Sequence, residues 1–531
     1  MKEWKEFNQD EVAKTHGQIY YYRDLYEGKH SKIFPRARHL IEKGEITDSI
    51  YYGENYAQNV QTPYITANVS KLIPEIPAML VSRSLGDIST SIESNEIESL
   101  DDEEQDDEEL ESIDYDVTQQ QVIDDIQENT HLEFEHWGNI VQQQVDGGLV
   151  GVPWLDEKGL RLEFKARDVY FPHDDNMGID LAYEIEIDEE RYLQIYREEV
   201  IDGDLHTSHI LYHIENTDKT KQLDEATTRE LLGIDELYKV YKGRDTSFII
   251  YWPNEKTFMN PLGVSCLKGQ DGKQDEINWT LTRNAITFER NGKPRIAVSK
   301  EIMQALEQKA VNRYGDSSRI DHRDLEVMTM DEDGNAMEII QIDISRIGDI
   351  QWVKDLMKLM LMETKTSEKA IDFYLNDNAG GHAESGVAKF YDLFTSIIKS
   401  EQIQQEYIYF IKQLFKSALW LANYADDSIE IEEPDIDTKA MIPISKKELT
   451  EQNAEAFDAD IQSLETTVRR NNPTASEEWI QEEMERIESE ESTSDSFSLM
   501  RGRQNLEQMM GNRDENNEPI NDDNNDDEEM E

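Results

Sequence analysis

The sequence predicts an α+β protein in which helices predominate. Apolar residues recur every three or four positions over most of the chain, which is the period of an amphipathic helix. Between residues 152 and 252 the period changes to alternation, as in antiparallel strands with one solvated face. The length of 531 residues exceeds what one core supports, so two to four domains are expected.

The composition is strongly acidic. The chain has 115 Asp and Glu against 53 Lys and Arg, a formal net charge of −62. Sequence-independent binding of DNA through a basic face is therefore disfavoured, because phosphate neutralisation needs clustered cations. A protein that coats anionic membrane is disfavoured for the same reason. A protein that guides DNA without binding it tightly remains compatible with this charge.

The single cysteine, Cys266, excludes an internal disulfide and a cysteine-based zinc site, and it indicates a reducing compartment. The N-terminus has no apolar run typical of a secretory signal. No apolar stretch is long enough to span a bilayer. A soluble product assembled in the cytoplasm, with no membrane partner, is expected.

The first long helical pattern covers residues 63–85, where Pro74 and Pro77 are expected to kink or divide the helix. An acidic run follows at 93–116. Like-charge repulsion predicts a solvated loop there, with a metal-binding or partner-mimicking acidic tract as the alternative. Helical spacing returns over 117–146.

Three glycines, Gly147, Gly148 and Gly151, are expected to end that helix. The alternating region from 152 to 252 then predicts an antiparallel meander. Tyr183, Ile185 and Ile187, for example, alternate with glutamates.

Two further helices are expected at 263–290, which is unusually polar, and at about 346–372. They bracket a small mixed unit at 295–344. Within it the sequence predicts a strand at 295–298, a helix at 300–312, and a turn at 333–335 between β-like runs at 325–330 and 336–344.

The strongest helical pattern is at 385–424, where apolar residues advance by three or four over forty positions. A helix of that length spans on the order of 60 Å, which suggests an element of a large assembly. Residues 426–450 are acidic and β-like, two helical patches follow within 446–490, and the acidic last 30 residues predict a disordered tail.

No motif for catalysis is found. The sequence has no phosphate-binding Gly-Lys-Ser/Thr loop, no His-Glu-x-x-His zinc motif and no Gly-x-Ser-x-Gly elbow. His173-Asp174-Asp175 is interpreted as a surface turn, and 331–335 as a hairpin turn without the spacing of a calcium loop. We therefore expect no enzyme activity, no catalytic residues, no cofactor and no metal.

Two features remain as functional candidates. The glycine-rich loop at 376–384 is either an ordinary connector or a mobile finger. The helices 263–290 and 346–372 form either a hairpin with an inserted lobe or a stalk that presents a distal contact module.

The order of these segments resembles portal proteins of tailed bacteriophages, of the Gram-positive siphovirus type. Residues 260–265 (Asn-Pro-Leu-Gly-Val-Ser), a polar helix and 291–295 (Asn-Gly-Lys-Pro-Arg) are similar to the family's entry into stem and clip. Residues 373–375 (Phe-Tyr-Leu) and 385–390 (Ser-Gly-Val-Ala-Lys-Phe) resemble the two sides of its tunnel loop. Asn472-Pro473-Thr474 resembles its crown segment. The match covers most of 20–490.

The resemblance implies a portal fold with a β-containing wing, long stem helices, a small α/β clip and a helical crown. In chain order it places the wing at 1–262 with the acidic insert at about 93–116, a stem helix at 263–290, the clip at 291–345, a second stem helix at 346–372, the tunnel loop at 373–384, a long wing helix at 385–424, the crown at 425–500 and an acidic tail at 501–531.

The resemblance also implies the function and the partners. The chain would form a ring of about 12 subunits at one capsid vertex of the virion, through which double-stranded DNA is packaged and ejected without sequence specificity. Its other partners would be the terminase large subunit, which hydrolyses ATP, a head–tail adaptor protein, and the scaffolding and major capsid proteins. Because many copies of charge −62 repel one another, ring closure is expected to be head-to-tail with apolar and salt-bridged interfaces. The helix at 385–424 is a natural contributor.

Site residues follow from this placement. DNA proximity is expected for the loop residues Asn376, Asp377, Asn378, Gly380, Gly381 and His382. Three stem cations, Lys268, Lys273 and Arg283, are candidates for the channel lining, with plain solvated charges as the alternative. Two other functions stay open: an acidic scaffold or DNA-mimic binding protein, and a DNA-processing enzyme of a mobile element.

Overall fold

The computed structural model describes most of the chain, and two compact units divide at 441/442. The described residues are 4–48, 62–92, 115–156, 159–174, 177–234, 236–291, 295–298, 300–315, 337–340, 350–367, 386–441, 446–459, 461–472, 479–484 and 486–487. The predicted acidic insert falls almost entirely outside them, as do the tunnel loop and the acidic tail.

The first unit begins with short helices. They are α1 (Gln9–His16), α2 (Ile19–Tyr26), α3 (His30–Ile33) and α4 (Pro35–Glu42). The 3₁₀ turn η2 (Val69–Lys71) leads into α5 (Leu72–Ser84) and strand β1 (Leu85–Ser89). Asn8 begins α1 as its N-cap by accepting hydrogen bonds from the backbone of Asp10 and Glu11.

The expected helix at 63–85 is shorter than predicted, because residues before Leu72 are extended or 3₁₀ and those after Ser84 form a strand. The prolines do not divide it. Pro74 lies in the first turn, where no N–H is needed, and Pro77 removes one hydrogen bond from a helix whose Ile73, Ala78 and Val81 are fully buried. Burial of that apolar face stabilises the continuous helix.

The pattern at 117–146 forms two helices instead of one. They are α6 (Tyr115–Thr130) and α7 (Leu132–Asp146). His131 separates them with a left-handed φ of 53°. Gly147 ends α7 with φ 80°, as expected, whereas Gly148 and Gly151 belong to the strand that follows.

The predicted meander is confirmed. A six-stranded antiparallel sheet has the order β4-β5-β6-β7-β8, with β9 also paired to β7. Its strands are β4 (Tyr170–Pro172), β5 (Gly178–Ile187), β6 (Glu190–Ile201), β7 (Asp204–Ile214), β8 (Thr220–Gln222) and β9 (Tyr238–Tyr241), with the 3₁₀ turn η3 (Arg167–Val169) before β4 and α8 (Glu225–Leu232) between β8 and β9. One face packs on α1 and α2 through a core that includes Trp4, Phe171 and Leu193.

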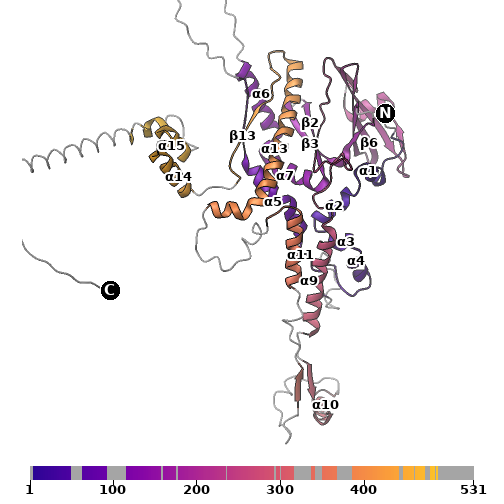
Figure 1. The fold of residues 1–531 in the computed structure, drawn as a ribbon. Coiled ribbons are helices and arrows are strands. Elements are labelled where there is room, and N and C mark those ends of the chain that lie inside the picture. The colour runs from indigo at the N-terminus through magenta and orange to yellow at the C-terminus, as the bar shows by residue number, and fades with distance from the viewer. Residues whose placement is uncertain are drawn as a thin grey trace, which may run out of the picture. The chain divides into compact units, whose positions relative to one another are not determined.

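A second sheet, of order β10-β2-β3, lies against the long helix α13 (Gly386–Ala425) (Figure 1). Its strands are β2 (Gly148–Asp156), β3 (Gly159–Ala166) and β10 (Ile250–Pro253). Gly151 sits so close to Leu414 and Phe410 of α13 that a Cβ atom there would overlap both side chains. The forty-residue α13 agrees with the helix expected at 385–424.

The segment between 263 and 363 follows the predicted order with shorter helices. It contains α9 (Asp271–Asn291), β11 (Arg295–Val298), α10 (Lys300–Tyr314), β12 (Met337–Ile340) and α11 (Ile350–Glu363). Residues 263–265 are irregular and 266–270 form turns, so α9 begins later than expected. Helix α11 ends at Glu363, before Lys365 adopts a φ of 54°.

Strand β12 pairs with β11, with Val298 opposite Met337, a pairing that the sequence analysis did not predict. The expected β-like run at 325–330 and the turns at 331–335 lie outside the described residues.

The predicted β-like stretch at 426–450 is correct only in part. Strand β13 (Asp435–Thr438) pairs with β1, whereas residues from Lys446 onward are helical. The second unit contains α14 (Lys446–Asp458) and α15 (Leu464–Asn471), which Asn453 joins by donating a hydrogen bond of 2.6 Å to Asn471.

The contact between α7 and α13 predicts acid sensitivity. His136 Nδ1 lies 2.9 Å from Tyr407 Oη, and burial lowers the pKa of His136 from 6.5 to about 4. The unfolded chain takes up this proton below pH 6.5, whereas the folded chain does so only near 4. The free energy of unfolding should therefore fall by up to about 3 kcal/mol as the pH drops through this interval.

Denaturant unfolding across that interval tests this expectation, with His136→Gln as the comparison. Glutamine keeps a polar partner for Tyr407 but does not titrate, so the variant should show a decline smaller by about that amount. Equal declines in the two proteins would contradict the role of His136.

Candidate functional site

Helices α9 and α11 lie side by side and run antiparallel (Figure 1). The start of α9 meets the end of α11, because Gln270 and Lys273 donate hydrogen bonds of 3.1 Å and 2.7 Å to the carboxylate of Glu363. The bond from Lys273 holds the pKa of Glu363 below its usual value. The two helices therefore form the pair that the sequence predicted.

The three predicted stem cations have different surroundings. Lys268 is exposed but lies in the turns before α9, and Arg283 is exposed on α9 itself. Lys273 is half-buried and paired with Glu363 within the same chain. The structure does not gather the three into one cluster, and their place along a channel stays a prediction.

The exposed side of α11 carries cations that the sequence analysis did not single out. Lys354 and Lys358 are exposed and four residues apart, so they share one face of the helix. The predicted loop residues, 376–382, lie outside the described residues. Their proximity to DNA stays a prediction too.

The polarity of α9 has a structural cause. Gln274, Asn278 and Thr282 are spaced by four residues and fully buried on one face. Their side-chain oxygens accept hydrogen bonds from the backbone N–H groups of Ser70, Ala67 and Ile65, at 3.0, 3.0 and 2.9 Å. We call these three residues the amide ladder of α9. They bind backbone N–H groups of the segment 65–70, which ends in η2 and does not continue helix α5 toward the N-terminus.

The amide ladder continues into the N-terminal helices through His30, which is fully buried. Asn278 Nδ2 donates to His30 Nδ1 at 2.8 Å, so the ring proton lies on Nε2, which donates to Leu25 O at 3.0 Å. Burial lowers the pKa of His30. A neutral histidine thus connects α2, α3 and α9.

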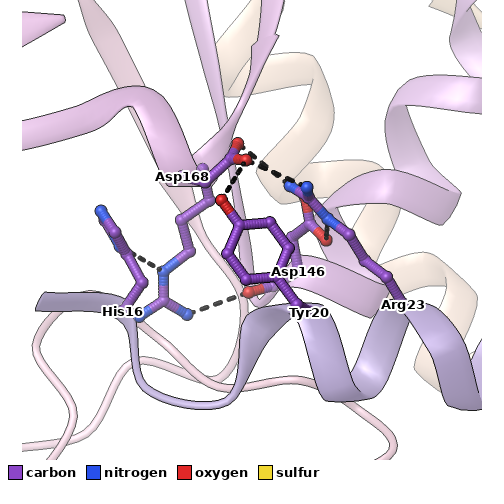
Figure 2. Close-up of polar contacts among 6 residues, drawn as sticks. His16, Tyr20, Arg23, Asp146 and Asp168 are labelled. Atoms are coloured by element: carbon purple, nitrogen blue, oxygen red, sulfur yellow. Dashed lines mark hydrogen bonds and ion pairs between the residues drawn. The ribbon is translucent and has the colours of Figure 1, made fainter. Parts of the chain in front are cut away.

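A buried ion-pair cluster fixes the N-terminal helices to the β region. Arg23 on α2 makes paired hydrogen bonds to Asp146 (2.8 and 2.7 Å) and to Asp168 (3.0 Å each). Figure 2 shows Arg23 between the two carboxylates, with Tyr20 pointing at Asp168. The Asp146 side chain is only 2% exposed, and its burial raises its pKa. Such a paired geometry offsets part of the cost of burial.

The guanidinium of Arg167 binds the backbone of the segment that precedes α9. Arg167 donates from Nη1 to Asp146 O and Gly263 O at 3.0 and 3.1 Å, and from Nε to His16 Nδ1 at 3.3 Å. Gly263, in the motif predicted to lead into the stem, has φ 81° and sits against Gly147 and Asn254 so tightly that a Cβ atom would overlap both backbones.

A third buried network lies under the sheet. Asp180 is fully buried and accepts hydrogen bonds from Arg197 (2.7 and 2.8 Å) and Trp4 (2.8 Å), and His173 Nε2 lies 2.9 Å from it. Burial alone would raise the pKa of Asp180, but these bonds hold it below its usual value. The interpretation of His173 as part of a surface turn is therefore wrong. It is 5% exposed, because β4 and β5 turn it inward toward Asp180.

No group of three or more His, Cys, Asp or Glu suited to a metal ion occurs in the part of the chain that the structure describes. Among the same residues, no helix is long and apolar enough to cross a membrane. The site candidate is the anchored pair α9 and α11.

Neither a protein-family model nor a curated protein matches the chain. Solved structures that match the chain include two from gene transfer agent particles. One is a chain in the virion of a native gene transfer agent particle, at 9% sequence identity and a TM-score of 0.41, covering 80% of this chain and 95% of that one. The other is a chain in the neck of an empty gene transfer agent particle computed with C6 symmetry, at 10% identity and a TM-score of 0.40, covering 79% and 94%.

Proposed function

We propose that the chain is a phage portal protein. In this proposal about 12 copies form a ring at one capsid vertex, double-stranded DNA passes through the ring during packaging and ejection, and terminase and head–tail connector proteins dock on it. The observation that carries the proposal is the antiparallel pair α9 and α11, fixed to the β region at its root and interrupted in sequence by the small β11–α10–β12 segment. This is the order that the sequence resemblance predicts for stem and clip.

The anchoring suits a channel wall. Side chains from α9 hold the backbone at 65–70, Arg167 holds Gly263, and Lys273 holds Glu363. A helix that lines a path for moving DNA must keep its position when force is applied along it. Several hydrogen bonds buried at one end of the pair meet that requirement.

The charge suits a path that does not bind its cargo. In this proposal the net charge of −62 per copy disfavours tight binding of DNA phosphate by the ring as a whole. The chain itself performs no chemistry in this proposal. The energy for translocation comes from the ATP-hydrolysing terminase. The ring formed by this chain is part of the virion.

Native mass measurement combined with electron microscopy tests the proposal. Purified full-length protein should assemble into rings of about a dozen copies, with a central hole wide enough for a DNA duplex. A stable monomer or dimer at micromolar concentration, across a range of salt concentrations, would contradict it.

The same measurement decides the second candidate. An acidic scaffold or DNA mimic is favoured by the charge of −62 alone, and it predicts a monomer or small oligomer without a hole. A DNA-processing enzyme is not proposed, because no observation on the described residues favours it.

A further inference from the structure

A cavity of about 340 Å³ lies between the start of α2, the turn η3 and the segment that leads into α9. Its walls include Gln18 at the start of α2, Arg167 from η3, and Ser265 and Lys268 from the segment before α9. We call this cavity the α2 pocket. Its volume is near the lower end of the range of small-molecule sites, so it has room for a small ion and not for a large cofactor.

Arg167 places a buried cationic donor at the α2 pocket. The residue is only 6% exposed. Its Nε and Nη1 are bound to His16 Nδ1 and to the carbonyl oxygens of Asp146 and Gly263. Its Nη2 donates a hydrogen bond to no residue that the structure describes. A donor on so buried a side chain normally has an acceptor, so Nη2 points to an acceptor that the chain itself does not supply.

The start of α2 adds backbone donors to the pocket. The helix is eight residues long, its N-cap residue Gln18 makes no side-chain cap hydrogen bond, and its first turn contains no acidic residue. The backbone N–H groups of Ile19, Tyr20 and Tyr21 form no hydrogen bond with the described part of the chain. Free N–H groups and the partial positive charge of a helix start together favour an anion.

The segment before α9 adds two further donors. Ser265 is 5% exposed, and its Oγ accepts a hydrogen bond of 3.2 Å from the backbone N–H of Leu267, which leaves the hydroxyl proton available for an acceptor. Lys268 is exposed and forms no ion pair with any described residue. The pocket is thus lined by donors from three separate parts of the chain.

The charges around the α2 pocket also favour an anion. Asp146 supplies the one carboxylate among the lining residues, and its side chain is 2% exposed and held by two hydrogen bonds from Arg23. Asp168 shares Arg23 with it. Against these two carboxylates stand the cations Arg23, Arg167 and Lys268. The surroundings of the pocket are therefore locally positive on a chain whose net charge is −62.

We propose that the α2 pocket binds a phosphate-class oxyanion, which accepts hydrogen bonds from Arg167 Nη2, the Ser265 hydroxyl and the first N–H groups of α2, with the ammonium of Lys268 beside it. Donors on several sides suit a tetrahedral anion better than a planar carboxylate. The ion links α2, η3 and the segment before α9, so it stabilises the root of α9. This inference does not depend on the proposed function.

Calorimetric titration of the full-length protein with inorganic phosphate tests the site, at an ionic strength held constant with chloride. Lys268→Ala removes a cation from the pocket, so the dissociation constant should rise about 10-fold. Lys242→Ala is the matched control and should bind like the wild type, because Lys242 is equally exposed, has no ion pair among the described residues and does not line the pocket. Arg167 is kept, because it also holds Gly263.

Gln18→Asp gives a second test, in which two effects have opposite signs. An aspartate at the N-cap supplies its own carboxylate to the free N–H groups of α2 and takes the place of the bound ion. In chloride this variant should unfold at a higher denaturant concentration than the wild type. Added phosphate should stabilise the wild type and leave the variant unchanged.

Two further titrations identify the source of the ion. Adenosine 5′-monophosphate carries the same group as an ester, and adenosine lacks it. Binding of inorganic phosphate alone supports a free ion, and binding of both phosphates without adenosine supports a phosphate monoester. A wild type that binds no phosphate would overturn the inference. Equal phosphate binding by the wild type, Lys268→Ala and Gln18→Asp would overturn it too, and so would adenosine that binds as tightly as its monophosphate.

Discussion

Replacing Gly263 with alanine is expected to lower the free energy of unfolding by at least about 3 kcal/mol, or to prevent soluble expression. Two costs combine at this position. The φ of 81° is unfavourable for any residue with a Cβ atom, and that atom would overlap the carbonyl oxygens of Gly147 and Asn254. Both neighbours are backbone atoms, held by the hydrogen bonds from Asn254 N to Gly147 O and from Val264 N to Asn254 O, so they cannot move aside.

Gly269→Ala is the matched control for this prediction. Gly269 has the same φ of 81°, but nothing lies within 4 Å of the place its Cβ atom would take. It should lose only about 1 kcal/mol, the cost of the left-handed conformation alone. Chemical denaturation of both variants measures the difference. Equal losses would show that the backbone contact at the entrance to α9 is not tight.

Replacing Arg23 with methionine is expected to lower the free energy of unfolding by about 3–5 kcal/mol. The change removes the guanidinium that satisfies the carboxylates of Asp146 and Asp168, and leaves Asp146 buried without its ion-pair partner. Methionine fills similar space, so lost packing contributes little. Denaturation of the wild type and the variant near neutral pH measures the loss.

The pH dependence of the variant gives a second readout. Burial already raises the pKa of Asp146, and without Arg23 that pKa should rise further. The loss of stability should therefore shrink as the pH falls and Asp146 becomes protonated. Arg23→Lys should lose less than Arg23→Met, since it keeps the charge but not the paired geometry. A loss in Arg23→Met that is small and independent of pH would contradict the role of the cluster.

Elements with a strong periodic pattern could be predicted from the sequence. The helix α13, the helix α10 and the meander β5–β7 agree with the expectations, since each depends on contacts whose spacing is visible along the chain. The mixed α+β class is confirmed with them. The predicted ends of helices were less accurate where contacts with a segment far away in sequence decide where the helix begins or ends.

The segment 65–70, which is not α-helical, is the clearest example. Its apolar residues have helical spacing, but its backbone is bound by Gln274, Asn278 and Thr282, more than 200 residues later in the chain. The sequence around residues 65–70 contains no signal that predicts hydrogen bonds to such distant residues. The polarity of α9 was visible in the sequence, yet it was interpreted as charge along a channel and not as a buried row of hydrogen-bond acceptors.

The candidate site shows the same limit. Arg23, Asp146 and Asp168 are far apart in sequence, and among 115 acidic residues no spacing distinguishes the two that bind Arg23. His173 was misjudged because its partner, Asp180, lies on β5 and is itself bound by Arg197 on β6. Phe134 fits the helical spacing of core residues, and only the structure shows its side chain exposed.

The amide ladder has a mechanical consequence. Its members recur every fourth residue, roughly 6 Å apart along the helix axis, and all three hold one stretch of backbone. A force along the axis of α9 therefore stretches all three hydrogen bonds at the same time. The helix cannot shift along its axis by a fraction of a turn without breaking all of them. Displacement of α9 should be a sudden slip of a whole turn, so the helix behaves as a rigid strut below a threshold force.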